Sequence, residues 1–501
     1  MSIRRQSIIS SLVIYTGFAV GLLNTYMFTR QGHFRNFTED EYGLVTIFIA
    51  IATMMSTIAL MAMPSYIFKF HPYYNEHLPE KKNDMITWAL LVSFVGFILV
   101  MIAGWALKHL VIKKFGTNSP QLVTYYYWIF PLGLGLTIYT VLEAYAWTLH
   151  RSVITNFFRE VQWRVFTTII IVLYLLHVVK DFDLFIKLFA FTYPGIAVGL
   201  FLYLFWKKKI HFNFSISKVS RRYFSKILAL CTFVYSGTLV FTISQVFDTI
   251  VIASLLPNGA AEAGKYGLAT IMTAIIQAPQ RGIISASIAH LSKAWKDKDH
   301  RLLQKIYQRS SINQLVFACA IFLLIWLNFR DGIISFHIKP VYLATANVFF
   351  LLGITKIIDM GTGVNAQIIA TSTYWKFELV SGVVLLVIML PLTYILTKSY
   401  GLIGPAIGSI VSITIYNIIR IIFLYKKFKL FPLTWQSLYT IILAGACYFT
   451  CYLAFRYFTG LTAIALRSVA FIFLYGMGVV YLKLTPDTLA LWGSVMKRLR
   501  R

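Results

Sequence analysis

Apolar residues run in long stretches along nearly the whole of this 501-residue chain, and polar residues gather in the short segments between them. Each stretch is long enough for a helix to cross the hydrocarbon core of a bilayer, which takes about 20 residues. The pattern therefore predicts an all-α polytopic membrane protein of about 14 transmembrane helices, without a sizeable water-soluble domain. The expected spans are residues 7–29, 42–68, 84–108, 121–149, 153–178, 182–206, 224–256, 264–291, 308–329, 341–371, 375–397, 401–425, 435–457 and 463–483.

The composition agrees with this pattern, because 58% of the residues are hydrophobic, 13% are charged and the mean hydropathy is +0.72. A formal net charge of +28 would suggest nucleic-acid binding in a soluble protein, but here the basic residues lie in loops beside the spans. Such clusters mark the cytoplasmic side and attract anionic lipid headgroups. We expect cytoplasmic termini, membrane lipids as partners and no nucleic acid. The clusters lie at 207–222, 293–309, 426–429 and 497–501.

Two segments of the chain begin alike. The sequence YGLVTI at 42–47 opens the second expected helix, and YGLATI at 266–271 opens the eighth. The same shift lays the first helix on the seventh, which predicts two duplicated six-helix halves. The expected organisation is an N-terminal six-helix lobe at 1–206, a basic cytoplasmic linker at 207–223, a C-terminal six-helix lobe at 224–430, and two additional transmembrane helices with a basic tail at 431–501.

No cofactor or metal site is predicted. The four cysteines lack the spacing of a metal site and are expected to be small packing residues. Arg4 and Arg5 precede a first apolar run without a small-residue cleavage site, so we expect a retained first helix. The cysteines are Cys231, Cys319, Cys447 and Cys451.

Three consecutive acids, Glu39, Asp40 and Glu41, stand before the second expected helix and could form the acidic loop of a membrane-embedded glycosyltransferase. A structural role explains them better. Thr38 can cap the helix with Glu41 at the third position as a capping box, and acids in the first turn suit the helix dipole. We therefore favour a helix cap over catalysis at this position.

Ionisable side chains well inside the spans are more informative. Each would cost several kcal/mol against lipid, and so indicates a partner or a water-filled cavity. Some have candidate partners on their own helix, because Glu160 and Arg164 are four residues apart and Lys356 and Asp359 are three apart. The full set, with nearby amides, is Glu143, Arg159, Glu160, Arg164, Asp248, Gln277, Arg281, Lys356, Asp359 and Asn365.

Arg281 has no such partner within one turn, and it lies about 15 Å or more from either end of its expected helix. Arg159, in contrast, is near enough to the interface to snorkel. Arginines that face a central cavity suit an anionic ligand, because a guanidinium holds phosphate oxygens in bidentate geometry. A lipid-linked sugar pyrophosphate fits this description. The expected substrate-binding residues are Arg159, Arg164, Gln277, Arg281, Lys356 and Asn365.

Several stretches resemble a known family. They are FTEDEYGL at 37–44, KYGLATIM at 265–272 followed by SASIAHLSKA at 285–294, GTGVNAQIIATS at 361–372, and YGLIGPAIGSIVSITIYNIIR at 400–420. Over residues 1 to about 430 the chain resembles the polysaccharide transporter family of the multidrug/oligosaccharidyl-lipid/polysaccharide exporter superfamily. That family includes bacterial O-antigen flippases and, more distantly, the lipid II flippase.

The resemblance implies a flippase of the bacterial inner membrane, with a V-shaped cavity between two six-helix lobes that opens alternately to either side. Cavity cations in such relatives hold the pyrophosphate of an undecaprenyl-linked oligosaccharide, and Arg164 and Arg281 occupy suitable positions. An ion gradient or membrane potential would act through Asp248 or Glu143 as ion-coupling carboxylates. The expected partners are the lipid-linked oligosaccharide and other polysaccharide-assembly proteins, and no covalent chemistry is expected.

Two other functions fit parts of the pattern. A drug or metabolite exporter of the same superfamily would share the fold, but it would need acids rather than cations in the cavity. A membrane-embedded oligosaccharide polymerase or ligase would need a substantial outer loop, yet the longest expected outer loop, 30–41, is explained largely by capping.

Overall fold

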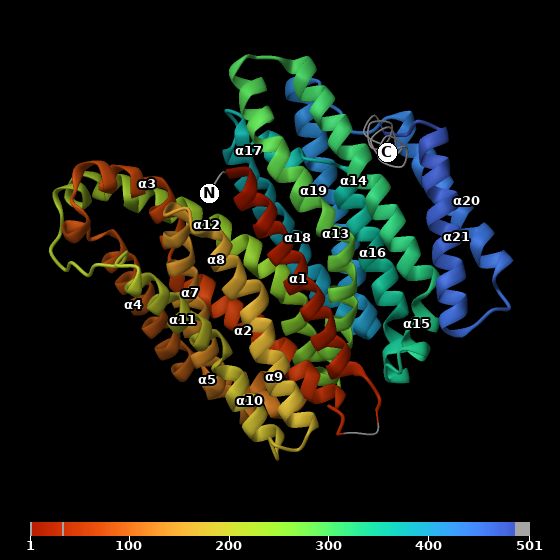
Figure 1. Ribbon diagram of the computed structural model, residues 1–501, viewed down its shortest axis with the longest axis horizontal. Coiled ribbons are helices and arrows are strands. Elements are labelled where there is room, and N and C mark those ends of the chain that lie inside the picture. Colours follow the sequence, from red (N-terminus) through yellow and green to blue (C-terminus); the bar gives the residue numbers. More distant parts are fainter. Residues whose placement is uncertain (1–2, 33–34, 486–501) are drawn as a thin grey trace. The chain divides into compact units, whose positions relative to one another are not determined.

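The computed structural model describes residues 3–32 and 35–485, and every regular element within these ranges is a helix (Figure 1). Eleven helical segments of the described residues are long and apolar enough to cross a membrane. The prediction of an all-α polytopic membrane protein is confirmed. One of the eleven segments, Lys376–Phe428, contains two expected spans, and the expected spans 153–178 and 264–291 fall on helices outside the eleven. The number of 14 spans therefore stays a prediction.

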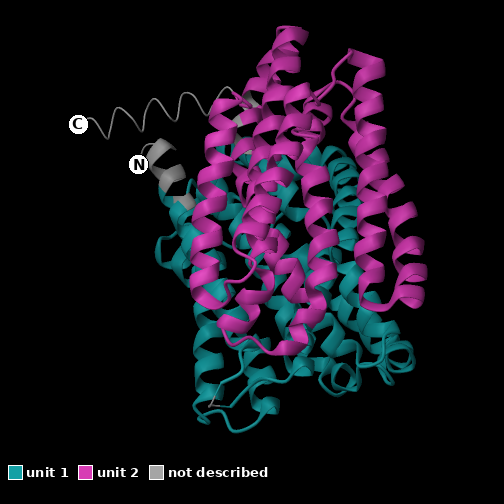
Figure 2. Ribbon diagram, turned by 90° about the vertical axis from the view of Figure 1, so that its right-hand side faces the viewer, with its two compact units in different colours: residues 1–264 teal, residues 265–501 magenta. Residues whose placement is uncertain are grey.

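The chain forms two compact units, Met1–Gly264 and Lys265–Arg501 (Figure 2). The helix α12 belongs to the first unit because it packs against α2 and α3. The division into six-helix lobes at the basic segment 207–223 stays a prediction. The first unit contains α1 (Ile3–Thr29), α2 (Glu39–Leu60), α3 (Met63–His77), α4 (Met85–Ala106), α5 (Lys108–Phe115), α6 (Pro120–Thr124), α7 (Ile129–Thr148), α8 (Ser152–Asn156), α9 (Trp163–Leu175), α10 (Phe182–Ala190), α11 (Thr192–Trp206) and α12 (Lys218–Leu255).

The helix α13 (Gly259–Lys296) begins in the first unit and continues into the second. Short 3-10 turns lie at Glu80–Lys82, Tyr126–Trp128, Pro340–Thr345 and Gly401–Ile403. The second unit further contains α14 (His300–Leu327), α15 (Phe329–Ser335), α16 (Ala346–Gly361), α17 (Asn365–Thr371), α18 (Lys376–Tyr400), α19 (Gly404–Phe428), α20 (Trp435–Ala454) and α21 (Gly460–Tyr481).

Several expected spans are not single helices, and two of them break at residues with positive φ angles. The span 42–68 breaks after α2, where Met61 and Ala62 both have positive φ angles, and Pro64 opens α3 in its first turn. The span 341–371 breaks between α16 and α17 at Gly363, whose φ is +68°. A Cβ atom at Gly363 would lie 2.9 Å from the backbone nitrogen of Ser311, so this position needs glycine for its φ and for the close approach.

Aromatic side chains form the core at one end of the first unit. The ring of Phe37 lies 4.7 Å from that of Phe28, 4.5 Å from that of Tyr174 and 5.0 Å from that of Phe185, measured between centroids. Phe37 and Phe185 are almost completely buried. Because Phe37 directly precedes α2, this packing fixes where the second helix enters the bundle.

The four cysteines are free and buried, as expected for packing residues. Three of them, Cys319, Cys447 and Cys451, lie in one apolar core of the second unit that joins α14 to α20 and α21. Phe471 and Tyr475 of α21 stack in the same core, with ring centroids 5.6 Å apart. The last two helices thus pack on the rest of the second unit through α14 and α15.

Candidate substrate-binding residues in each unit

The charges of the expected span 153–178 lie in and beside a widened helical turn. The helix α8 continues into a π-helix at Phe157–Gln162, which is followed directly by α9. Arg159 and Glu160 belong to the π-helix, and Arg164 follows it by two residues. Such turns have wider hydrogen-bonded rings than an α-helix and occur frequently at functional sites.

Arg159 forms an ion pair with Glu143 of α7. Its Nη1 donates to Oε2 of Glu143 at 2.7 Å. Glu143 is only 4% exposed, whereas the side chain of Arg159 is 44% exposed. A carboxylate this deeply buried requires a counter-charge, and Arg159 supplies it. The two predicted site residues are therefore brought together as a neutral pair.

Arg164 and Glu160 meet as their spacing predicts. The guanidinium of Arg164 contacts the Glu160 carboxylate and also donates to the Glu160 carbonyl at 2.8 Å. The backbone carbonyl of Arg164 accepts from Nδ2 of Asn24 on α1 at 2.9 Å, and Thr168 donates to Oδ1 of Asn24 at 2.6 Å. The charge on Arg164 is largely compensated by its own helix.

The helix α1 leaves space for this widened turn through two glycines. A Cβ atom on Gly17 would lie 2.3 Å from the Glu160 carbonyl oxygen, and one on Gly21 would lie 2.8 Å from Nε of Arg164. The two glycines are four residues apart, the small-residue spacing that lets membrane helices approach closely. The sequence-based inference considered neither glycine, although the GFAVG motif at 17–21 was the available signal.

The other predicted site residues differ in burial and in ion pairing. Asp248 of α12 is buried in the first unit. In the second unit Arg281 of α13 is exposed and forms no ion pair with the other described residues, while Gln277, one turn earlier, is partly buried. Lys356 of α16 is also partly buried. Among the predicted cations, Arg281 therefore has its charge least compensated.

Asn365 belongs to a buried polar network of the second unit. Its Nδ2 donates to Oγ1 of Thr362 at 3.0 Å and to Oδ1 of Asn417 at 2.9 Å. Nδ2 of Asn417 in turn donates to Oδ1 of Asp359 at 3.2 Å. Asn365 is 3% exposed and thus connects helices rather than facing an open surface.

Arg420 is the central cation of this network, and the sequence-based set omitted it. It is 3% exposed, donates to Oγ of Ser381 at 3.3 Å and to Oδ1 of Asn365 at 3.4 Å, and pairs with the carboxylate of Glu378. Its guanidinium carbon also lies 3.9 Å from the ring centroid of Tyr416. The available signal was an arginine inside the expected span 401–425.

The acidic segment forms the first turn of α2, and its hydrogen bonds are structural. Thr38 and Glu41 form the predicted capping box, in which the Thr38 amide donates to Oε2 of Glu41 at 2.8 Å and the Glu41 amide donates to Oγ1 of Thr38 at 3.2 Å. Oδ1 of Asp40 accepts from the amide of Ala261 in the first turn of α13 at 3.1 Å. Two of the three acids therefore hold helix ends within the first unit.

The chemistry available at these residues is ionic and hydrogen-bonding. Within the described part of the chain no group of three or more His, Cys, Asp or Glu side chains could hold a metal ion. Ion pairs among the described residues include Arg159 with Glu143 and Arg164 with Glu160 in the first unit, and Arg420 with Glu378 and Arg467 with Asp331 in the second.

The fold is shared with solved membrane transporters. The structure titled "Lipid II flippase MurJ, inward closed conformation" has a TM-score of 0.70 at 17% identity, with 95% of this chain and 99% of that chain covered. An inward-facing multidrug resistance MATE family transporter of the MOP superfamily has a TM-score of 0.65 at 11% identity, with 84% of this chain and 98% of that chain covered. A MOP superfamily transporter from Pyrococcus furiosus has a TM-score of 0.54 at 12% identity, with 85% of this chain and 95% of that chain covered. The chain therefore has the fold of these multi-pass membrane proteins.

The family follows from the sequence itself. Residues 3–295, more than half of the chain, match the family described as Polysaccharide biosynthesis protein, and the chain belongs to that family. The resemblance inferred from the short motifs is thereby confirmed. No curated protein matches the chain.

Proposed function

We propose that this transporter is a flippase for a lipid-linked oligosaccharide of the undecaprenyl-pyrophosphate type. It moves the saccharide from the cytoplasmic to the outer leaflet of the bacterial inner membrane. There the saccharide is used in the biosynthesis of a surface polysaccharide, such as the O-antigen of lipopolysaccharide. Both termini of the protein are cytoplasmic. Membership in a polysaccharide biosynthesis family supports a saccharide cargo. The transporter fold supports movement of that cargo by alternating access.

The observation that carries the proposal is the exposure of Arg281 at a position far from the end of its helix. Arg281 is exposed on α13, about 22 Å from the C-terminal end of the helix at 1.5 Å per residue, and it forms no ion pair with another residue that the structure describes. A cation so far from a helix end is costly without an anionic partner, and a transient pyrophosphate would provide one. Gln277, one turn away on α13, is placed to add a hydrogen bond.

The other predicted residues have narrower roles in this proposal. Arg159 and Arg164 carry carboxylate partners, so they can hold a phosphate only if those pairs open during the cycle. Lys356 and Asn365 would contribute in the second unit. Asp248 and Glu143, both buried in the first unit, are the candidates for ion coupling.

The test is depletion of the protein followed by mass spectrometry of lipids extracted from each leaflet. We expect a lipid-linked oligosaccharide to accumulate on the inner leaflet, and its composition identifies the cargo. Re-expression of Arg281→Ala should restore export at least tenfold less well than the wild type, because one charge-assisted contact is lost. Arg281→Lys should recover part of it. Arg222→Ala, at an exposed position near the start of α12, is the matched control. Normal export by Arg281→Ala would contradict the assigned role.

A further inference from the structure

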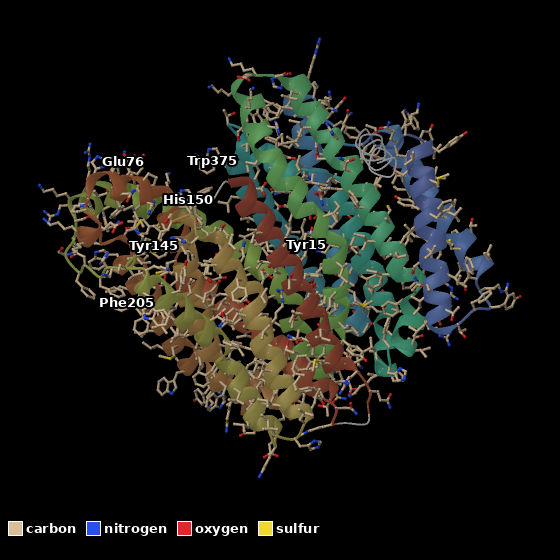
Figure 3. The ribbon with its side chains drawn as sticks, viewed as in Figure 1. Tyr15, Glu76, Tyr145, His150, Phe205 and Trp375 are labelled. Atoms are coloured by element: carbon tan, nitrogen blue, oxygen red, sulfur yellow. The ribbon has the colours of Figure 1, made fainter. Side chains whose placement is uncertain are left out.

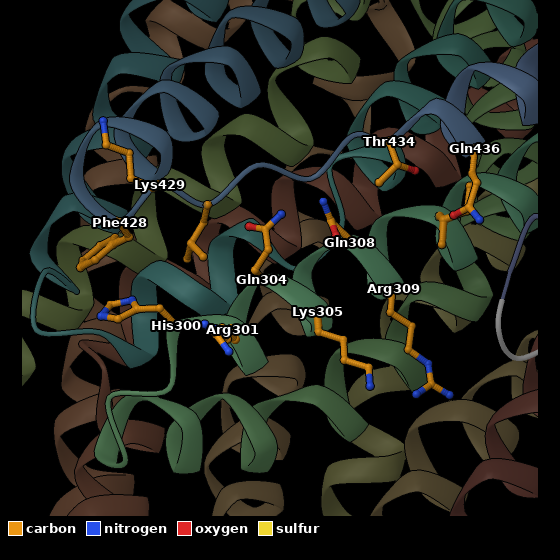
Figure 4. Close-up of a pocket in the computed structure, with 12 residues that line it drawn as sticks. His300, Arg301, Gln304, Lys305, Gln308, Arg309, Phe428, Lys429, Thr434 and Gln436 are labelled. Carbon is orange, nitrogen blue, oxygen red and sulfur yellow. The ribbon is translucent and has the colours of Figure 1, made fainter.

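A basic pocket lies in the second unit, apart from the residues proposed above. It has a volume of about 530 Å³ and is formed by the first half of α14, the end of α19 and the segment that joins α19 to α20 (Figure 4). None of the described residues that line it is acidic. Its basic side chains are His300, Arg301, Lys305, Arg309 and Lys429.

The spacing of these cations concentrates charge on one helix face. Arg301, Lys305 and Arg309 follow one another at intervals of four residues, and Figure 4 shows Lys305 and Arg309 extending in the same direction from α14. An anion with several oxygens can contact more than one of these cations at once.

The wall opposite α14 is held in place by hydrogen bonds. Nε2 of Gln304 donates to the Phe431 carbonyl at 2.8 Å, and the Phe431 amide donates to Oε1 of Gln304 at 3.0 Å. The ring of His300 stacks on that of Phe428 with centroids 6.3 Å apart. The joining segment is therefore tied to α14, and the pocket keeps its shape without a ligand.

An apolar groove of about 680 Å³ adjoins the pocket along α16, α19 and α20. Thr434 lines both cavities, and Leu315 of the groove lies less than one turn beyond Ile312 of the pocket. The groove surface is mainly aliphatic, with Ile418 and Leu438 exposed. The helix α20 packs on α14 and α21, which leaves this groove open beside α19.

We propose that the pocket and groove together bind an anionic diacyl phospholipid. The phosphate headgroup occupies the basic pocket, and one acyl chain lies in the apolar groove. Both cationic segments, 293–309 and 426–429, belong to the predicted cytoplasmic clusters, where basic pockets between transmembrane helices recognise anionic headgroups. The groove distinguishes a lipid from a soluble phosphate, because only a lipid uses both surfaces. This resident lipid is separate from the transported saccharide.

The test is native mass spectrometry of the purified full-length protein, titrated with phosphatidylglycerol and with phosphatidylcholine of the same chains. We expect phosphatidylglycerol to bind at least tenfold more tightly. Lys305→Gln with Arg309→Gln should weaken its binding at least tenfold, since two headgroup contacts are lost. The control pair Arg221→Gln with Arg222→Gln removes the same charge from an exposed basic segment and should change binding less than twofold.

A groove variant tests the acyl chain independently of charge. Ile418→Trp fills the groove and should also weaken phosphatidylglycerol binding at least tenfold, while thermal unfolding verifies that each variant is folded. Competition decides the source of the phosphate. Displacement of the lipid by millimolar inorganic phosphate, equal binding of phosphatidylcholine, or tighter binding of undecaprenyl phosphate would each overturn the proposal.

Discussion

The pair of Glu378 and Arg420 allows a quantitative prediction, because its two members differ in exposure. The side chain of Arg420 is 4% exposed and that of Glu378 is 35% exposed. Removing either partner leaves the other charge behind, and the cost depends on whether water can reach it. Glu378→Ala leaves a deeply buried guanidinium without its counter-charge, whereas Arg420→Met leaves a carboxylate that water can solvate.

The expected magnitudes follow from this asymmetry. Glu378→Ala should lower the free energy of unfolding by about 3 kcal/mol, the lower end for breaking a buried ion pair, because Ser381, Asn365 and the Tyr416 ring still contact Arg420. Arg420→Met should cost about 1 to 2 kcal/mol, since methionine fills the aliphatic volume and the Glu378 side chain that loses its partner is 35% exposed.

The assay is unfolding of the purified protein in mixed detergent micelles with increasing dodecyl sulfate, followed by tryptophan fluorescence. Glu76→Ala is the control, because Glu76 is an exposed glutamate on α3 (Figure 3) and should change the free energy by less than about 0.5 kcal/mol. A larger loss for Arg420→Met than for Glu378→Ala would refute the burial argument. The argument would also be refuted if Glu378→Ala lowered the free energy of unfolding no more than the control variant does.

Three further predictions concern the first unit. Gly43→Ala should cost about 3 kcal/mol or more, because its Cβ would lie 1.6 Å from a backbone oxygen of α13; Gly476→Ala, with open space around it, should be nearly neutral in the same unfolding assay. Glu143→Gln should cost only about 1 kcal/mol, because the half-exposed Arg159 can turn to water; a loss matching that of Glu378→Ala would contradict this. Burial, with a smaller effect of the nearby His150, lowers the pKa of His71 below its ordinary value of 6.5. The unfolded chain then takes up this proton more readily, so stability should fall as the pH drops below 6.5, and thermal unfolding of His71→Gln at pH 7 and pH 5 should show a smaller fall than the wild type.

The helices could be predicted from the sequence because hydropathy alone determines which stretches can enter a bilayer. Their breaks could not. The positive φ angles of Met61 and Ala62 are set by packing, and neither residue type favours that conformation. Gly363 was visible as a glycine, but its contact with the Ser311 backbone depends on residues 52 positions away.

The candidate site was predictable where partners share a helix. Glu160 and Arg164 meet because i, i+4 spacing is a local property. Glu143 with Arg159, and Glu378 with Arg420, pair between different helices, and no spacing rule reveals such contacts. Arg420 lies five residues from the end of its expected span, where an arginine can equally reach the interface, so its burial became evident only from the structure.

The π-helix at Phe157–Gln162 determines the direction in which the side chains of the following helix, α9, point around the helix axis. Deleting a single residue there would allow an ordinary α-helix to form, and each residue of an α-helix advances the chain by about 100° around the axis. Arg164 would then swing away from Gly21, and Asn24 would lose the carbonyl it now binds. One extra residue in the chain thus decides the direction in which a charge points within the bilayer.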